Sequence, residues 1–397
     1  MRWAYGWNIV AAAMVYQAFA YGTIISSFTL FLPFWAADFA IAKSTAAFYV
    51  TISTLLGGFA GAVIGPLFDR FSVKLLMLVG AGLYILSFLL LSVITSATHL
   101  FFVFSILLSL SLLLLSITPS QVLVARWFPE KTSVPISIVA TGMAFGGIVL
   151  PPLVAFLILE LEGWRAACRA LAILAAVIVV PLILFVVRDR PADFAAKARA
   201  KAESGSAPER GPILRSPKFL LALLAAVPLY SIYSGFQANL GPMMLAKGSG
   251  LGEISASLAV LNGASLVASL SSGWLLLKIA HRNLYHAMAV IAMIGIAVFA
   301  LASGPVLPLA ASALIGLGIG ATGAILTAYF FASFGADRMG TVLGFASPFS
   351  RIAVFAPPLF ALGNEISGGY TLPLIGLGAL ALITLVGATL MPRPARA

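Results

Sequence analysis

Long apolar runs separated by short polar segments make up most of the sequence. A helix needs about 20 apolar residues to cross the hydrocarbon core of a bilayer, and most of these runs reach that length. Charges or Gly and Pro residues, which favour helix ends, mark most boundaries. The pattern predicts twelve membrane-spanning helices, at residues 7–34, 46–68, 75–95, 100–125, 133–159, 166–187, 219–246, 254–277, 284–303, 306–332, 341–362 and 370–391.

The longest polar interruption lies near the middle of the chain. Residues 188–218 hold eight Lys and Arg residues among Ser, Ala and Pro, a composition typical of a solvated loop. The sequence therefore predicts an all-α membrane protein with an N-terminal six-helix bundle at 1–187, a cytoplasmic linker at 188–218 and a C-terminal six-helix bundle at 219–397.

The two predicted halves repeat short patterns. Glycines occupy every fourth position in residues 57–65, and small residues do the same 208 residues later, in 265–273. Pro-Pro-Leu occurs at 151–153 and again 206 residues later, at 357–359. Small residues four apart allow close helix packing. Two related halves are typical of secondary transporters that hold their substrate between them.

The composition excludes several other classes of protein. Hydrophobic residues make up 61% of the chain and charged residues 9%, against about 25% charged residues in soluble domains. The net charge of +11 resides mainly in loops, so we expect the lipid bilayer and not nucleic acid as a partner. The single cysteine, Cys168, excludes an internal disulfide and a thiolate metal site, and no cofactor is expected.

The basic residues also predict the orientation in the membrane. With the N-terminus inside, 18 of the 23 Lys and Arg residues fall in inside segments and four in outside segments. This bias follows the positive-inside rule and predicts that both termini are cytoplasmic. The first apolar run is too long for a signal peptide, and the short inside-facing tail suits a bacterial inner membrane.

The segment after the second apolar run carries a motif. Gly65-x-x-x-Asp69-Arg70 followed by Lys74 resembles the loop 2–3 signature of the major facilitator superfamily, although Ser and Val replace the usual Gly and Arg just before Lys74. A degenerate copy begins at Gly273. The resemblance covers the whole chain. It implies two pseudo-symmetric bundles, alternating access and function as a single chain.

A narrower resemblance concerns the type of substrate. Residues 126–131 (Arg-Trp-Phe-Pro-Glu-Lys), the motif Gly142-x-x-x-Gly146-Gly147 and the Pro-Pro pairs resemble the monocarboxylate and oxalate/formate group. This group often carries a substrate-binding Arg on helix 8, where the present chain has Ser269, whereas Asn262 does match.

Two further positions bear on that narrower resemblance. The group can carry a cation on helix 11, and Arg351 lies on that predicted helix. The aromatic residues that enclose a small dicarboxylate on helix 10 are replaced by Gly320 and Ala324. We therefore expect a roomier cavity, or a larger ligand, than oxalate requires.

Arg351 lies inside a predicted spanning helix. An arginine at mid-membrane costs about 2.5–3.5 kcal/mol on insertion scales, and all twelve Asp and Glu residues fall in loops or at helix ends. A substrate anion bound by the guanidinium is one way to compensate this cost. The alternatives are hydrogen bonds to backbone carbonyls near Pro348, or a side chain that extends towards the cytoplasm.

Other polar and aromatic side chains lie on helices expected to line the cavity. Such groups orient ligands in apolar pockets, although each one alone is also common at helix–helix contacts. Tyr230, Tyr233 and Gln237 share one helical face. The predicted substrate-binding set is Arg351, Tyr21, Gln17, Gln121, Tyr230, Tyr233, Gln237, Asn262 and Tyr329.

Asp69 lies at the C-terminal end of a predicted helix, where the helix dipole disfavours an anion. It therefore needs compensation, from Arg70, Arg126 or the N-terminus of helix 11. The family resemblance implies a latch between the two halves, and the alternative is a local pair with Arg70. The predicted latch set is Gly65, Asp69, Arg70, Lys74 and Arg126.

These observations favour a secondary transporter, not an enzyme, that moves a small organic anion, most simply a monocarboxylate, with Arg351 as its counter-ion. The alternatives are an efflux carrier for bulky, weakly charged compounds and a non-transporting membrane sensor. Proton-driven pumps commonly use an intramembrane Asp, Glu or His, and none is placed mid-helix here. Facilitated diffusion, exchange for a counter-anion, and co-transport with a proton carried by the substrate remain open.

Overall fold

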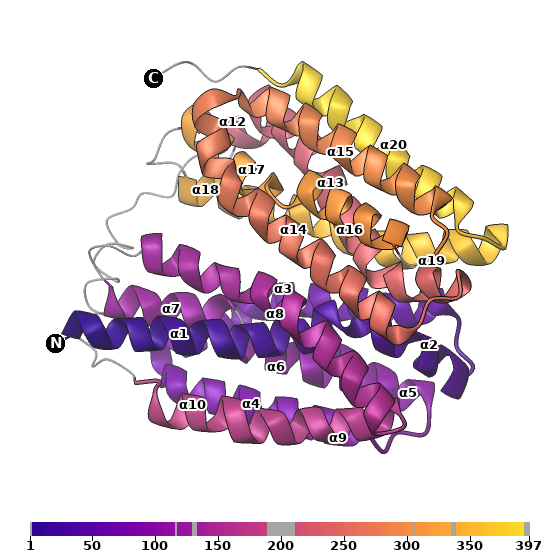
Figure 1. Cartoon of the computed structure of the whole chain (residues 1–397). Helices are drawn as coiled ribbons and strands as arrows, with labels where there is room; N and C mark the ends of the chain where they lie inside the picture. Colours follow the sequence, from indigo (N-terminus) through magenta and orange to yellow (C-terminus); the bar gives the residue numbers. More distant parts are fainter. Residues whose placement is uncertain are drawn as a thin grey trace. The chain divides into compact units, whose positions relative to one another are not determined.

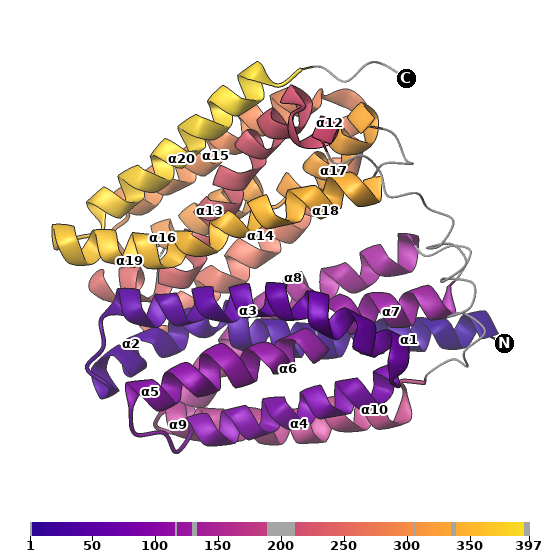
Figure 2. The ribbon, with the colours of Figure 1, turned by 180° about the vertical axis from the view of Figure 1, so that it is seen from behind.

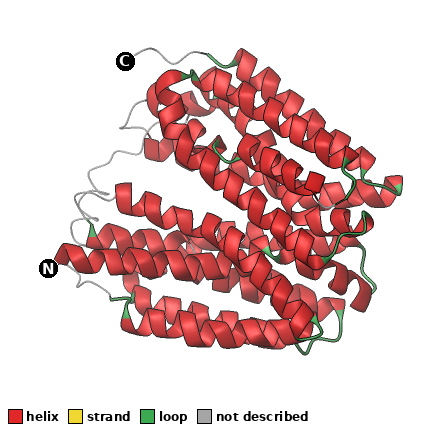
Figure 3. Ribbon diagram, viewed as in Figure 1, coloured by secondary structure: helices red, strands yellow, loops and turns green. Residues whose placement is uncertain are grey.

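The computed structural model describes residues 2–115, 117–128, 133–188, 211–304, 306–334 and 339–392. Within these ranges the regular structure is helical throughout (Figures 1 and 3). The chain divides into two compact units. The first comprises Met1–Ala42 and Tyr49–Ser206, and the second comprises Lys43–Phe48 and Ala207–Ala397.

The first unit contains six helical segments, of which three include a wider π-helical turn and one, α3, has its first turn in the second unit. Helix α1 packs against α8, and α4 packs against α6 and α9. The segments are α1 (Arg2–Tyr21) with η1 (Gly22–Ser26) and α2 (Phe28–Asp38); α3 (Lys43–Arg70); α4 (Val73–Leu91); α5 (Ala97–Leu100) with η2 (Phe101–Leu107), α6 (Leu108–Leu115) and α7 (Ile117–Trp127); α8 (Ser133–Glu160); and α9 (Trp164–Leu174) with η3 (Ala175–Val179) and α10 (Val180–Phe185).

The second unit also contains six long segments, preceded by the short helix α12 (Gly211–Leu214). Helix α13 packs against α20, and α15 packs against α16 and α20 (Figure 2). The long segments are α13 (Pro217–Ala246); α14 (Leu251–Lys278); α15 (His281–Leu301); α16 (Val306–Ile319) with α17 (Thr322–Phe334); α18 (Met339–Ser350) with η5 (Arg351–Phe355) and α19 (Ala356–Ser367); and α20 (Thr371–Leu390).

The predicted all-α membrane fold with twelve spanning segments is confirmed. Ten helical stretches in the described residues are long and apolar enough to cross a membrane. The other two predicted spans, 46–68 and 341–362, are helical as α3 and as α18–η5–α19. Large apolar side chains such as Leu277 and Leu301, which are 83% and 82% exposed, form a surface suited to lipid.

The first turn of α3, Lys43–Phe48, belongs to the second unit and makes polar contacts with two of its residues. The backbone nitrogen and hydroxyl of Ser44 donate to the two carboxylate oxygens of Glu365 at 2.9 and 2.6 Å. The Nζ atom of Lys43 donates to the hydroxyl of Tyr370 at 3.4 Å. The Glu365 carboxylate thus accepts from the start of a helix, where an anion is favoured.

Glycine allows close packing of α1 against α8 in the first unit. A Cβ atom on Gly146 would lie 2.2 Å from the carbonyl oxygen of Ala18, and one on Gly22 would lie 2.6 Å from the carbonyl oxygen of Gly146. Both neighbours are backbone atoms, which cannot move without moving a helix. Gly22 and Gly146 therefore allow close helix packing, and for Gly146 this agrees with the four-residue spacing of the motif Gly142-x-x-x-Gly146.

Gly320 has a similar role in the second unit. A Cβ atom there would lie 2.1 Å from the carbonyl oxygen of Ser265, and one on Gly316 would lie 2.3 Å from that of Leu261. The absence of a side chain at Gly320 therefore lets the backbone of α14 pack directly against the segment α16–α17, the tenth predicted span. The expectation that Gly320 widens a cavity is wrong, because the space left by its missing side chain is filled by a neighbouring helix.

One end of the first unit carries an ion pair between Asp38, at the end of α2, and Arg165, at the start of α9. The Asp38 carboxylate also accepts from Trp164 Nε1 at 3.0 Å. Partial burial opposes ionisation, but the hydrogen bonds from Trp164 and Arg165 and the Arg165 charge outweigh it, so the pKa of Asp38 lies below its usual value.

Replacing Asp38 by Asn should lower the stability of the protein at neutral pH by about 0.2–1 kcal/mol, the range for exposed ion pairs. Because the folded-state pKa is depressed, this stabilisation is present above a pH of about 4 and is lost as the pH falls through the folded-state pKa. Thermal unfolding of both proteins between pH 3 and 7 measures it. An unchanged difference across that range would contradict the assignment.

Candidate substrate-binding site

Three of the predicted substrate-binding residues form one hydrogen-bonded cluster in the second unit. Tyr233 and Gln237 lie on α13 and Asn262 lies on α14. The Tyr233 hydroxyl donates to Asn262 Oδ1 at 2.8 Å, and Gln237 Nε2 approaches Tyr233 Oη at 3.2 Å and Asn262 Oδ1 at 3.4 Å. The structure thus joins residues that are 25 to 29 positions apart in the sequence.

The cluster has a buried part and an accessible part. Asn262 and Gln237 are 1% and 5% exposed, and Asn262 Nδ2 donates to the carbonyl oxygen of Leu258 at 2.8 Å. Buried amides are stable only when hydrogen-bonded, so this pair fixes the orientation of the Tyr233 ring. Tyr233 itself is half-buried. Its ring and hydroxyl are the part of the cluster that can contact a ligand.

Arg351 is the first residue of η5, a 3₁₀ turn that interrupts helix 11 between α18 and α19. The residue is exposed. The adjoining α13 contacts this turn through Ser234, whose hydroxyl donates to the carbonyl oxygen of Ala353 at 2.9 Å. A neighbour of Tyr233 therefore touches the turn that carries Arg351.

Tyr230 and Tyr329 lie apart from this hydrogen-bonded cluster. A Cβ atom on Gly323 of α17 would be 3.0 Å from the Tyr230 hydroxyl, which places Tyr230 against the helix 10 segment. Tyr329 is fully buried, and its hydroxyl donates to the carbonyl oxygen of Pro392 at 2.9 Å. The polar end of Tyr329 thus holds the chain that follows α20.

The first unit contributes a different set of residues from α1. Gln17 is 0% exposed, and neither polar atom of its amide has a hydrogen-bond partner among the described residues. Tyr21 is half-buried. Nearby hydroxyls are paired: Tyr16 with Ser120 at 2.8 Å, and Thr23 with Tyr84 at 2.7 Å. An unpaired buried amide is costly, so within the described residues Gln17 is a polar group of α1 with unused bonding capacity.

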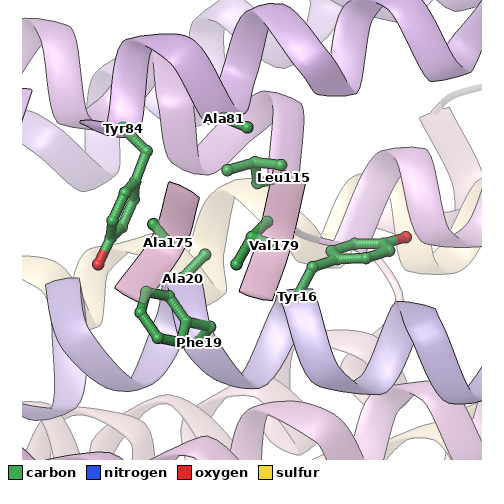
Figure 4. A pocket seen from close by; sticks show the side chains of 8 residues that line it. All are labelled: Tyr16, Phe19, Ala20, Ala81, Tyr84, Leu115, Ala175 and Val179. Atoms are coloured by element: carbon green, nitrogen blue, oxygen red, sulfur yellow. The ribbon is translucent and has the colours of Figure 1, made fainter. Parts of the chain in front are cut away.

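The gap between α1, α4, α6 and η3 shown in Figure 4 is a packing defect. Its lining is largely apolar, and it leaves no room for a water molecule. The Tyr16 hydroxyl points away from the other residues that line it (Figure 4). These lining residues are Tyr16, Phe19, Ala20, Ala81, Tyr84, Leu115, Ala175 and Val179. No binding function is assigned to this gap.

Several predicted residues have side chains outside the described part of the structure, namely Gln121, Gly65, Asp69, Arg70 and Arg126. The fifth member of the predicted latch set, Lys74, lies in α4 and donates through Nζ to the carbonyl oxygen of Leu184 at 2.6 Å. Two more side chains bind the chain that follows. The Tyr5 hydroxyl donates to the carbonyl oxygen of Val186 at 2.8 Å, and Trp127 Nε1 donates to that of Arg188 at 3.1 Å.

Lys74 and Tyr5 thus satisfy carbonyl groups at the end of α10, which the helix itself leaves without donors, and Trp127 binds the chain just beyond it. Lys74 therefore has a local role in holding the end of this helix in the first unit. Its predicted part in a latch stays a prediction.

Ser234 is a residue that the sequence analysis missed. The feature of the sequence that could have pointed to Ser234 is the pair Pro357-Pro358. Two consecutive prolines remove two backbone donors from the eleventh predicted helix. A spanning helix with missing donors needs polar side chains on its neighbours. Small polar residues on neighbouring helices are therefore worth testing wherever a spanning helix carries such a pair.

Comparisons with known proteins fit this architecture. The family profile described as Major Facilitator Superfamily matches residues 14–358. The structure is similar to the crystal structure of a bacterial homolog of the human lysosomal transporter Spinster, described as inward-facing and unoccupied, with a TM-score of 0.73 and 12% sequence identity over 98% of this chain and 93% of that one. At this identity the likeness shows the fold alone.

Two curated relatives are more similar in sequence. The chain is 26% identical over 247 residues to "MFS transporter asaE" of Aspergillus flavus, covering 61% of this chain and 52% of that protein. It is 28% identical over 163 residues to "Monocarboxylate transporter 13" of Bos taurus, covering 41% and 38%. The chain thus spans about half or less of these relatives. With a profile match over most of its length, it belongs to the Major Facilitator Superfamily.

Proposed function

We propose that this protein is a secondary transporter that moves a small organic anion, most simply a monocarboxylate, by alternating access. The observation that carries the proposal is an exposed arginine at a break in a membrane-spanning helix, beside a polar face of α13. A guanidinium binds a carboxylate through two parallel hydrogen bonds. Arginines placed within membrane-spanning segments commonly mark substrate pathways.

The proposed roles of the other residues follow from their chemistry. Arg351 binds the carboxylate, while the hydroxyl of Tyr233, oriented by Asn262 and Gln237, contacts the uncharged part of the substrate. Gln17 on α1 offers a second amide with unused donors and acceptors. The candidate residues for substrate contact therefore come from both units, Gln17 from the first and the α13–α14 cluster with Arg351 from the second. The curated relative named as a monocarboxylate transporter supports this class of substrate.

The alternative of an efflux carrier for bulky, weakly charged compounds has weaker support. It depended on small residues of helix 10 that leave room for a large ligand. Gly320 instead packs against the backbone of α14, so it adds no space. We further propose that both termini are in the cytoplasm, as the distribution of basic residues indicates, and that the protein works as a single chain in a bacterial inner membrane.

Ligand-dependent thermal stability tests the proposed class of substrate. Purified protein is screened against carboxylates of graded size, each paired with its uncharged amide. A bound carboxylate at about 100 times its Kd should stabilise the protein by ~2.7 kcal/mol, which raises the Tm. The amides should have little effect. Equal stabilisation by the amides would favour the efflux carrier, and no response to any carboxylate would contradict the proposal.

A further inference from the structure

Helix 11 lacks two backbone donors just beyond Arg351. Pro357 and Pro358 open α19, and neither has an N–H group. In an α-helix those groups would donate four residues back, to the carbonyls of Ala353 and Val354. Carbonyl groups at membrane depth need partners within the protein. The prolines therefore leave the turn Arg351–Phe355 dependent on donors other than its usual helical ones.

Helix α13 supplies two side chains at this place. The hydroxyl of Ser234 donates to the carbonyl oxygen of Ala353 at 2.9 Å, which also accepts from the N–H of Ala356 in the 3₁₀ pattern. Asn239 Nδ2 donates to the carbonyl oxygen of Pro357 at 3.1 Å and to that of Gly235 at 2.9 Å. The two α13 side chains thus bind carbonyls within and just after the 3₁₀ turn.

Helix α13 lies in close contact with the residue that follows the turn. A Cβ atom on Gly235, between the two anchoring side chains, would lie 3.4 Å from Ala356 Cβ and 3.6 Å from its carbonyl oxygen. Asn239 is 1% exposed, so water does not compete for its amide. The Asn239 bonds are therefore made away from water, where losing a partner is costly, and Ser234 is half-buried.

The form of this turn decides where Arg351 points. A 3₁₀ helix has three residues per turn and rises about 2.0 Å per residue, against 3.6 residues and about 1.5 Å for an α-helix. Over the turn Arg351–Phe355, a change to the α form would rotate its start by roughly 100° and shorten it by roughly 2.5 Å. A guanidinium displaced in this way would no longer face the same ligand.

We propose that Ser234 and Asn239 are positioning residues that hold helix 11 in its 3₁₀ form and so aim Arg351 at the substrate. They act through the backbone and do not touch the substrate. The inference rests on the proposed function and adds to it the part of the protein that sets the geometry of the anion site.

The test compares Ser234→Ala with Ser231→Ala in a transport assay with a carboxylate substrate. Ser231 lies on the same helix and, among the described residues, donates to its own helix at the carbonyl of Val227, so it is a matched control. Ser234→Ala should raise the KM about tenfold, the effect of one lost hydrogen bond, with kcat and Tm close to those of the control. Ser234→Thr, which keeps the hydroxyl, should restore the KM.

Asn239→Leu provides the second variant, and it should raise the KM in the same manner. A fall in Tm and kcat with an unchanged KM would show that both residues only hold helices together, and would overturn the proposal. An unchanged KM and Tm would overturn it as well.

The role of Arg351 is tested separately by combining variants. In a protein with Arg351→Gln, Ser234→Ala should have no further effect on the KM. A full tenfold effect in that background would overturn the positioning role alone. Transport that is unaffected by Arg351→Gln would instead show that the proposed function is wrong.

Discussion

Replacing Arg351 by Gln is expected to lower the kcat/KM for a small carboxylate roughly 100-fold while leaving the protein folded. Hydrogen bonds to charged groups contribute about 1.5–3 kcal/mol each, and ~3 kcal/mol corresponds to a factor of roughly 100. The exposed position of Arg351 means that Gln fits there without leaving a cavity. Uptake of a labelled carboxylate into proteoliposomes, together with the Tm, measures both parts of the expectation.

Two further variants separate the roles of charge and shape. Arg351→Lys keeps the positive charge but loses the planar pair of donors, so its activity should lie between those of the wild type and Arg351→Gln. Lys278→Gln removes a cation that lies over the Trp274 ring at 4.1 Å, and it should transport normally. If Lys278→Gln were as inactive as Arg351→Gln, the effect would come from net charge and not from a binding site.

Gly146→Ala should destabilise the protein strongly for its size. The added Cβ atom would lie 2.2 Å from the carbonyl oxygen of Ala18, so α1 and α8 must move apart along their contact. Overpacking of this kind costs about 1–3 kcal/mol and occasionally more. The better helix propensity of Ala returns only about 1 kcal/mol. The net result should be a lower Tm.

Gly82→Ala is the matched control, because a Cβ atom on that glycine of α4 would meet nothing within 4 Å. Its Tm should be equal to or higher than that of the wild type. Gly320→Ala should behave like Gly146→Ala, since its Cβ atom would also meet a backbone carbonyl. A stable Gly320→Ala protein with altered substrate preference would instead support the wider cavity that the sequence indicated.

The sequence predicts the architecture well because the physical signal is strong. Apolar runs of membrane-spanning length have few alternative interpretations, and the repeats at 57–65 and 265–273 indicate two related halves. The family motif at Gly65–Arg70 gives the same answer. The number of helices, the fold class and the family can therefore be predicted from the apolar runs, the repeats and the motif, each of which can be recognised in the sequence without knowing how the helices pack.

The details of the site are harder to predict because they depend on pairs of helices. The spacing of Tyr233 and Gln237 predicts a shared face, but their bonds to Asn262 depend on how α13 meets α14. Tyr329 has an aromatic ring and a hydroxyl of the kind that bind ligands. In the structure, however, its hydroxyl donates to the carbonyl oxygen of Pro392.

Glycine positions show the same limit. Gly320 leaves a gap in a single helix, and only the approach of Ser265 on α14 shows that this gap is filled. The break at Arg351 is similar, because Pro348 and Pro357 indicate a weakened helix but not a 3₁₀ turn held by Ser234.

Counterflow of a labelled monocarboxylate in proteoliposomes tests the central claim most directly. Vesicles loaded with unlabelled substrate should transiently accumulate the label above its external concentration, with no ATP added, and Arg351→Gln should abolish this overshoot. A carrier shows this behaviour because both substrates use one alternating site. Binding of the monocarboxylate without any overshoot in the wild-type protein, or an equal overshoot with Arg351→Gln, would contradict transport of an organic anion through a site at Arg351.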